Sequence, residues 1–213
     1  MRNIKAVLFD FDGTLADTME DNYVSWRKVL SPRGCDLKEG DYYHLEGTSP
    51  KELVKKYEKI FGKTLGDPHK LYEEKDKAYK ELNRFKLYDG VESLISSLRD
   101  KGISLGIVTA GKKKRIFDCL DKEFIKNFDV FVTGDEKHPG KPAPDPYLRG
   151  AKLLSLDSAE CLVVENAPLG VLSAKNANML CIAITSTVGS EKLSLADFVV
   201  SDIKKCVEYP QFP

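Results

Sequence analysis

The stretch Ala6–Thr18, AVLFDFDGTLADT, decides the fold. It opens with a largely apolar run of strand length, and such runs are typical of parallel strands that are buried on both faces of a sheet. Two acids, Asp10 and Asp12, follow two positions apart, so in an extended strand they point to the same side. Gly13 then permits a tight turn. Taken alone, this pair of acids predicts no more than a turn closed by an aspartate side chain.

Similar short apolar runs recur along the chain. They cover Ile103–Val108, Val130–Val132, Leu162–Val164, Cys181–Ile184 and Phe198–Val200. Helical patterns separate them, as where Val91, Leu94, Ile95 and Leu98 recur at the spacing of one helix face. Alternation of strands and helices predicts an α/β fold, a doubly wound parallel sheet with right-handed crossovers.

One interval is too long for this alternation. About 90 residues separate Asp12 from Ile103, whereas a βαβ unit needs roughly 30. The excess carries helical apolar stripes that begin at Met19, Leu53 and Leu71. We therefore predict a core domain of residues 1–16 and 85–213, with an all-helical cap domain, residues 17–84, inserted after the first strand. Because open α/β sheets bind ligands at the carboxyl ends of their strands, we expect the cap to cover that edge.

The composition indicates which partners and which cellular compartment to expect. The 33 basic and 33 acidic residues cancel, so no nucleic-acid-binding surface is predicted. No apolar run reaches the roughly 20 residues that span a membrane, and the N-terminal residues do not resemble a signal peptide. The five scattered cysteines indicate reduced thiols and a cytoplasmic location. The oligomeric state stays open.

Polar residues also end the later strands. Thr109, Ala110 and Gly111 offer a hydroxyl and backbone N–H groups at the start of a helix, which suits phosphate, although a simple helix cap has the same pattern. Lys141 is held between Gly140 and Pro142, where an exposed lysine is the alternative. Glu165 and Asn166 end another buried run. Each signal is weak alone, and their ordered occurrence on an α/β pattern is specific.

Together these residues resemble the haloacid dehalogenase superfamily. DFDGTL matches the first family motif, Thr109 the second, Lys141 the third and Glu165-Asn166 the fourth. The resemblance covers the whole chain and is greatest to the β-phosphoglucomutase and phosphoglycolate phosphatase group, which has a helical cap. It implies that Asp10 is the nucleophile and Asp12 the general acid and base.

The resemblance also implies the remaining roles. Thr109, Ala110, Gly111 and Lys141 would bind phosphate, with Lys141 neutralising the nucleophile. Asp10, the backbone carbonyl of Asp12, Glu165 and Asn166 would supply oxygen ligands, which suit Mg²⁺. The family usually has two acids at the fourth motif. With Asn166 in place of the second acid, we expect intact catalysis with weaker Mg²⁺ binding.

The expected activity is that of a Mg²⁺-dependent phosphatase acting on a small phosphorylated metabolite through an aspartyl-phosphate intermediate. The alternative is a β-phosphoglucomutase-like phosphomutase. In that group a cap histidine stands where this chain has Asn22, and a cap arginine stands where it has Pro50. A non-catalytic phosphate-binding module is the third reading, and it is disfavoured because no catalytic residue is missing.

Two groups of cations stay unassigned. Lys112, Lys113, Lys114 and Arg115 follow the Thr109 loop and are read as a solvated face, with attraction of anionic substrates as the alternative. The cap cations Lys51, Lys55, Lys56, Lys75 and Arg84 are candidate substrate contacts. The sequence does not choose among them.

Overall fold

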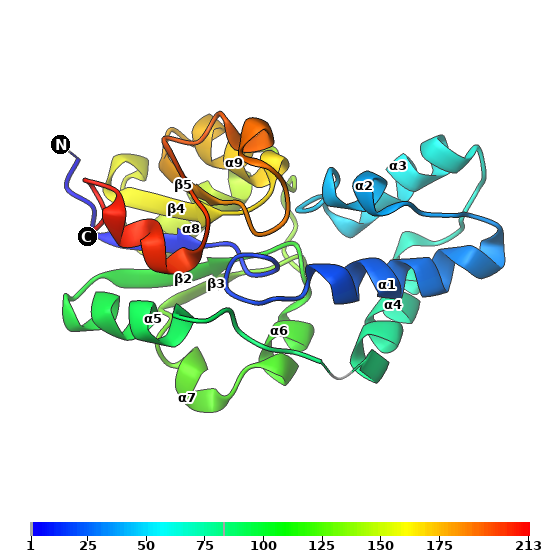
Figure 1. Ribbon diagram of the computed structural model, residues 1–213, viewed down its shortest axis with the longest axis horizontal. Coiled ribbons are helices and arrows are strands. Elements are labelled where there is room, and N and C mark those ends of the chain that lie inside the picture. Colours follow the sequence, from blue (N-terminus) through cyan, green and yellow to red (C-terminus); the bar gives the residue numbers. More distant parts are fainter. Residues whose placement is uncertain (1, 83) are drawn as a thin grey trace.

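Six parallel strands form one sheet in the order β3-β2-β1-β4-β5-β6 (Figure 1). The structure is a computed structural model that describes residues 2–82 and 84–213. The strands are β1 (Ala6–Phe9), β2 (Ser104–Val108), β3 (Val130–Val132), β4 (Cys161–Glu165), β5 (Leu180–Ile184) and β6 (Phe198–Val200). Each predicted apolar run overlaps one of them, and the predicted α/β class and parallel sheet are confirmed.

The first strand ends earlier than its apolar run indicates. β1 stops at Phe9, and Asp10 follows it, with its N–H still bonded to the Val164 carbonyl at 2.9 Å. Asp12 lies beyond the strand in a loop that turns at Gly13, whose φ is +84°. The two acids are therefore not neighbours on one face of a strand, and their side chains reach different partners.

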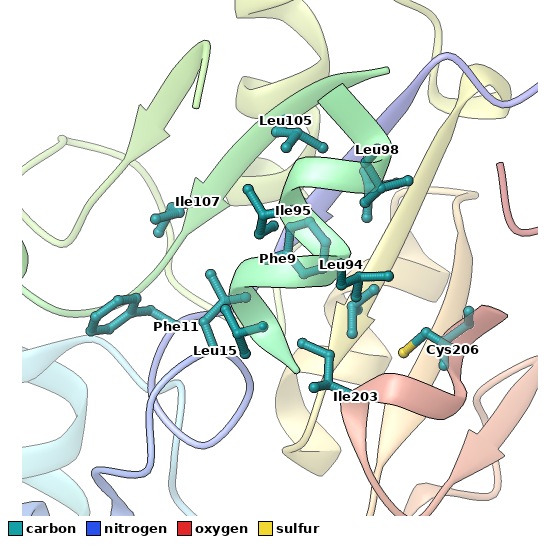
Figure 2. Close-up of a cluster of buried hydrophobic side chains, with 14 of the residues drawn as sticks. Phe9, Phe11, Leu15, Leu94, Ile95, Leu98, Leu105, Ile107, Ile203 and Cys206 are labelled. Atoms are coloured by element: carbon teal, nitrogen blue, oxygen red, sulfur yellow. The ribbon is translucent and has the colours of Figure 1, made fainter. Parts of the chain in front are cut away.

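Helices cover both faces of the sheet. They are α5 (Val91–Asp100), α6 (Lys113–Cys119), α7 (Lys122–Ile125), α8 (Asp145–Leu153) and α9 (Pro168–Asn176), with 3-10 turns at Ser158–Glu160, Ser190–Leu193 and Ile203–Glu208. Phe9 shares one buried cluster with Leu94 and Ile95 of α5, as Figure 2 shows. Leu8, the residue before Phe9 in β1, joins the opposite cluster with Tyr147 of α8. Successive residues of β1 thus alternate between two apolar layers, as in a doubly wound fold.

The helices between β1 and α5 have a hydrophobic cluster of their own. They are α1 (Met19–Leu30), α2 (Glu39–Tyr43), α3 (Pro50–Phe61) and α4 (Pro68–Leu82), with a 3-10 turn at Ser31–Arg33. Trp26 lies at the centre of this cluster, with its ring edge-on to Tyr57 at 5.4 Å and to Tyr72 at 5.8 Å. All four helices lie within the range predicted for the cap and extend beyond the carboxyl ends of the strands (Figure 1).

Across the part of the chain that the structure describes, every helix is too short or too polar to span a membrane.

Candidate active site

The polar strand ends of β1, β2 and β4 meet at one edge of the sheet. Phe9, the last residue of β1, is in register with Ile107 of β2 and Val164 of β4. Asp10, Thr109 and Glu165 each follow or end one of these strands, so parallel pairing brings them together. The structure therefore places three of the sequence-predicted site residues side by side.

Lys141 lies between two carboxylates. Its Nζ is 2.6 Å from Asp10 Oδ1 and 2.6 Å from Glu165 Oε1, and it donates a further hydrogen bond to the Val108 carbonyl at 3.2 Å. The Lys141 side chain is only 2% exposed, so the alternative of an ordinary surface lysine is wrong. The Tyr147 hydroxyl donates to the same Glu165 oxygen at 2.8 Å.

Burial and charge pull the ionisation of this group in opposite directions. Burial raises the pKa of Asp10 well above its usual range, with a further rise from the Glu165 charge, while the Lys141 charge and hydrogen bond oppose it. For Lys141, burial lowers the pKa, but the charges of Asp10 and Glu165 outweigh it, so the pKa stays above the usual value. Lys141 is thus a fixed cation beside the proposed nucleophile.

Glu165 has partners at both of its oxygens. Oε1 accepts from Lys141 and Tyr147, and Oε2 accepts from the backbone N–H groups of Asn166 at 2.9 Å and Ala167 at 3.0 Å. The first turn of α9 closes over it so tightly that a Cβ on Gly170 would lie 1.7 Å from Oε1. These contacts suit a residue that positions Lys141.

Asn166 faces the loop after β1 instead. Its Oδ1 accepts from the Thr14 hydroxyl at 3.0 Å, and its Nδ2 donates to the Thr187 hydroxyl at 2.7 Å. A Cβ on Gly13 would lie 2.1 Å from Nδ2, so the glycine of the DFDGT stretch is needed for this approach as well as for its positive φ. One amide oxygen thus lies against the turn that carries Asp12.

Asp12 is enclosed by donors. Arg115 of α6 grips the carboxylate with both terminal nitrogens, Nη1 lying 2.9 Å from Oδ1 and Nη2 pairing with Oδ2. The Thr18 hydroxyl and the Asn22 amide donate to Oδ1 at 2.6 Å and 3.1 Å. Burial disfavours the charged form, but the Arg115 charge and these hydrogen bonds outweigh it and hold the pKa of Asp12 at about 2.

Sequence reasoning missed Arg115. It reads this residue as part of a solvated basic face, whereas the side chain is 3% exposed and paired with Asp12. Lys112, Lys113 and Lys114 at the start of α6 are at least partly exposed, in keeping with that reading. The sequence carries no signal that separates Arg115 from the three lysines before it, because the rotation of α6 determines which of these cations is buried.

Lys75 is the cap cation that reaches the site. It is 2% exposed, donates to Asn22 Oδ1 and lies 3.7 Å from Asp76. Burial and the nearby Arg115 charge lower its pKa to about 8. The other cap candidates, Lys51, Lys55, Lys56 and Arg84, keep exposed or partly exposed side chains. The structure thus identifies Lys75 as the cation beside the site, among the five cap candidates that the sequence left open.

Thr109 borders a small cavity at the end of β2. Its Oγ1 accepts from the Gly111 N–H at 3.0 Å, so the hydroxyl organises its own loop. The cavity has a volume of about 30 Å³ and is lined by Thr109, Ala110, Lys141 and the cap-loop residues Gly47 and Ser49, among others. This space holds at most a few water molecules, and the cap-loop residues in its lining close it over the predicted phosphate seat.

A metal ion at this edge of the sheet would be bound by neutral oxygen atoms more than by carboxylates. Within residues 2–82 and 84–213, no group of three or more His, Cys, Asp or Glu side chains is arranged to hold a metal ion. The available set is instead one carboxylate, Asp10, with the Asp12 backbone carbonyl and the Asn166 amide oxygen. Mg²⁺ in proteins commonly uses one or two carboxylates and retains water, so this donor set fits it chemically.

Comparison with known proteins identifies the family of the chain. A model of the haloacid dehalogenase-like hydrolases matches residues 7–184. Validoxylamine A 7'-phosphate phosphatase of Streptomyces hygroscopicus subsp. limoneus is 27% identical, over 97% of this chain and 97% of that protein. Hexitol phosphatase A of Escherichia coli (strain K12) is 30% identical, over 94% of this chain and 92% of that protein.

A solved structure extends the comparison. The β-phosphoglucomutase of Clostridium difficile has a TM-score of 0.83 and 26% identity, covering 93% of this chain and 91% of that one. The chain belongs to the haloacid dehalogenase-like hydrolase family. The predicted resemblance to its phosphatase and phosphomutase group and the predicted phosphatase class of the enzyme are confirmed.

Proposed function

We propose that the protein is a Mg²⁺-dependent phosphatase that hydrolyses a small phosphorylated metabolite through an aspartyl-phosphate intermediate. The contact that carries this proposal is the buried pair of Asp10 and Lys141, with Nζ 2.6 Å from Oδ1 at the sheet edge. A carboxylate positioned by a fixed cation beside a Thr109 loop suits nucleophilic attack on a phosphate ester. The relatives named above as phosphatases support the same chemistry.

The reaction has two steps. In the first, an Asp10 oxygen forms a bond to phosphorus, the ester P–O bond breaks, and Asp12 gives a proton to the departing alcohol oxygen. Since the pair with Arg115 holds the pKa of Asp12 at about 2 in this structure, Asp12 takes up that proton only when the anionic substrate binds beside it and raises its pKa. In the second, water attacks the phosphorus of the aspartyl-phosphate, Asp12 takes the proton from the water, and inorganic phosphate leaves. Thr109, Ala110, Gly111 and Lys141 hold the phosphate oxygens.

Electrostatic repulsion explains why cations are needed. A phosphate dianion about 4 Å from the Asp10 carboxylate meets repulsion of roughly 8 kcal/mol at an effective dielectric near 20. Lys141 offsets part of it. Bound Mg²⁺ would supply the remaining positive charge between the carboxylate and the phosphate. We assign its ligands to Asp10, the Asp12 carbonyl and Asn166 Oδ1, which keeps a second lone pair beside the Thr14 hydrogen bond.

This assignment separates Glu165 from Asn166, both of which the sequence suggests as metal ligands. Glu165 is more useful as the positioning residue for Lys141, because its two oxygens already accept from Lys141, Tyr147 and two backbone N–H groups. We propose that Asn166 is the direct ligand of the pair and Glu165 is not.

We also propose that residues 17–84 act as a movable cap over the site. A Cβ on Gly47 would lie 3.2 Å from the Lys141 side chain, and a Cβ on Gly140 would lie 3.0 Å from Ser49. The cap loop is therefore in contact with the phosphate seat. With about 30 Å³ free, substrate entry requires this loop to move away.

A phosphomutase is the second candidate, favoured by the structural likeness to β-phosphoglucomutase. Asn22 is evidence against a phosphomutase. Its amide links Asp12 to Lys75 by hydrogen bonds in place of the histidine of the mutase group, and it carries no titratable proton. Conversion of a sugar 1-phosphate to its 6-phosphate faster than phosphate release would replace the phosphatase proposal with this one.

The direct test measures Mg²⁺-dependent phosphate release from 4-nitrophenyl phosphate. Asp10→Asn removes the nucleophile, and we expect at least about a 10³-fold loss of kcat, as when other enzymes lose their nucleophile. Asp17→Asn is the matched control, because Asp17 makes an ion pair with Lys86 on the surface. Equal activity of Asp10→Asn and the control would refute the assignment of this site.

A further inference from the structure

We propose that Arg115 sets substrate specificity by binding a second anionic group, a carboxylate or a phosphate, that the leaving alcohol carries close to its ester oxygen. The inference rests on the proposed phosphatase function and names the class of substrate for that site.

The guanidinium of Arg115 uses only part of its donor capacity. Nη1 and Nη2 pair with the two oxygens of Asp12. Nε is buried and has no hydrogen-bond partner among the described residues. A guanidinium has five N–H donors in a planar arrangement, so a second edge, containing Nε and one terminal nitrogen, remains beside the edge that holds Asp12. This edge has the shape that binds a carboxylate or phosphate with two parallel hydrogen bonds.

The leaving group of the substrate must come to the same place. Asp12 Oδ1 already accepts from Arg115, Thr18 and Asn22, whereas the Oδ2 atom has one donor, Arg115, within the described part of the chain. Oδ2 is therefore the open oxygen of Asp12, and an alcohol oxygen bonded to it lies next to the guanidinium. A substituent one or two carbons from that oxygen meets the unused edge.

The surroundings favour an anion there. Lys75, itself buried, approaches from α4, and the Arg115 guanidinium lies 5.4 Å from the centre of the Tyr79 ring. A cleft of about 560 Å³ continues outward between α4 and α6. It is lined by Lys77, Lys80, Lys112, Lys114 and Arg115 against Glu73, Asp76 and Glu81. Of these cations, Lys80 and Lys114 pair with Asp118 and Arg115 pairs with Asp12, so Lys77 and Lys112 supply the attraction for anionic ligands at this cleft.

A neutral alcohol leaves this donor edge without a partner. A buried donor that a ligand fails to satisfy is disfavoured, so sites built around such a donor discriminate strongly against analogues that lack the matching group. The expected substrate is therefore a phosphate monoester of a short hydroxy acid or a short diol bisphosphate. Arg115 takes the place of the cap arginine that is absent at Pro50, but it comes from the core.

The experiment compares three phosphate esters of matched length: phosphoglycolate, ethane-1,2-diol bisphosphate and 2-hydroxyethyl phosphate. We expect kcat/KM of the wild type for at least one anionic ester to exceed that for the neutral one by about tenfold to 10³-fold. The carboxylate and bisphosphate arms distinguish the two sources of the second anion. Equal kcat/KM for all three overturns the inference.

Variants of Arg115 test whether this residue causes the preference for anionic esters. Arg115→Gln should bring the ratio of anionic to neutral kcat/KM to within about threefold of one, and Arg115→Lys, which keeps the charge but loses the planar donor edge, should lower it by about tenfold. Lys126→Gln is the matched control, because Lys126 makes an exposed ion pair with Glu123 outside the cleft, and its ratio should match the wild type. An unchanged ratio in both Arg115 variants overturns the role of Arg115.

The failures are distinguishable. If phosphate release depends on Asp10 but shows no preference for a second anion, the inference alone is wrong. If no ester is hydrolysed in an Asp10-dependent manner, the proposed function is wrong as well. A general loss of stability in Arg115→Gln does not affect the comparison of ratios, and the wild-type measurement needs no variant.

Discussion

The Lys141 ammonium lies 2.6 Å from the Glu165 carboxylate, and both side chains are almost completely buried, at 2% and 1% exposed. This pair fixes the cation that faces Asp10. Removing the charge of one partner from a buried pair is strongly destabilising, by about 3–5 kcal/mol, because the other charge is left without compensation. The Lys141–Asp10 contact remains in this case, so the lower end of that range applies.

We therefore predict that Glu165→Gln lowers the free energy of unfolding by about 3 kcal/mol and reduces phosphate release. The Mg²⁺ concentration for half-maximal activity should rise by no more than about 10- to 100-fold, as for residues that act on a metal site from outside its ligands. Urea denaturation and Mg²⁺ titration check both parts. Glu136→Gln, which breaks an exposed pair with Arg149, is the control. A complete loss of the Mg²⁺ response in a folded Glu165→Gln protein would show that Glu165 binds the metal directly.

We predict that Asn166→Asp strengthens the binding of Mg²⁺. A carboxylate at this position adds a negative charge beside Asp10 and the Asp12 carbonyl, and ligand charge is a main determinant of divalent-cation affinity. We expect the Mg²⁺ concentration for half-maximal activity to fall by roughly threefold to tenfold. The donor to Thr187 is lost, so a modest drop in stability accompanies the change.

The control for this change is Asn176→Asp. Asn176 is exposed and donates to the Pro142 carbonyl, and it is not a proposed metal ligand. Its Mg²⁺ response should equal that of the wild type. If Asn166→Asp binds Mg²⁺ no more tightly than this control, the assignment of Asn166 as a ligand is wrong.

Much of the site could be predicted because it follows from sheet pairing. Asp10, Thr109 and Glu165 sit at ends of apolar runs, and parallel strands necessarily bring those ends to one edge. The order of elements and the helical insertion follow from the same periodic signals. These features depend on local sequence and on topology.

Arg115 and Lys75 could not be predicted in this way. Each lies among other cations, in KKKR and EEKDK, and only the rotation of α6 and α4 separates the buried cation from its exposed neighbours. Their burial also requires α4 to pack over α6, which is a contact between the cap and the core. Hydrophobic periodicity carries no information about such a polar contact.

The ion pair of Asp12 and Arg115 should appear in the pH dependence of stability. The pKa of Asp12 is about 2 in the folded protein, against an ordinary value of 3.8. A depressed carboxyl pKa adds stability above the unfolded pKa, and that stability is lost as the pH falls toward the folded pKa. The shift corresponds to about 2 kcal/mol.

We therefore predict that the difference in unfolding free energy between the wild type and Asp12→Asn, measured in the presence of a chelator, falls by about 2 kcal/mol between pH 4 and pH 2. It should be constant between pH 5 and pH 7. Asp17→Asn serves as a control whose carboxylate is partly exposed. A difference that does not change with pH would contradict the ion pair.

Lys75 gives the last prediction, because its pKa is lowered. The folded value is about 8 and the ordinary value is 10.5, mainly because of burial and then because of the Arg115 charge. Between these two pH values the unfolded chain binds more protons, so the wild type gains stability as the pH rises and loses it as the pH falls through 8. Below pH 8 the buried charge costs about 3 kcal/mol relative to an unshifted lysine.

Lys75→Met keeps the length of the side chain and removes the charge. We predict that it is more stable than the wild type at pH 7 and that this advantage closes between pH 8 and pH 10.5, while KM for the preferred anionic ester rises because Lys75 no longer attracts it. Unfolding curves across this pH range and initial rates at pH 7 measure the two effects. Lys70→Met, an exposed change on the same helix and outside the cleft lining, should alter stability by less than about 0.5 kcal/mol and leave KM unchanged. A Lys75→Met protein that is less stable than the wild type at pH 7, with unchanged KM, would mean that Lys75 only supports the packing of α4 against α1.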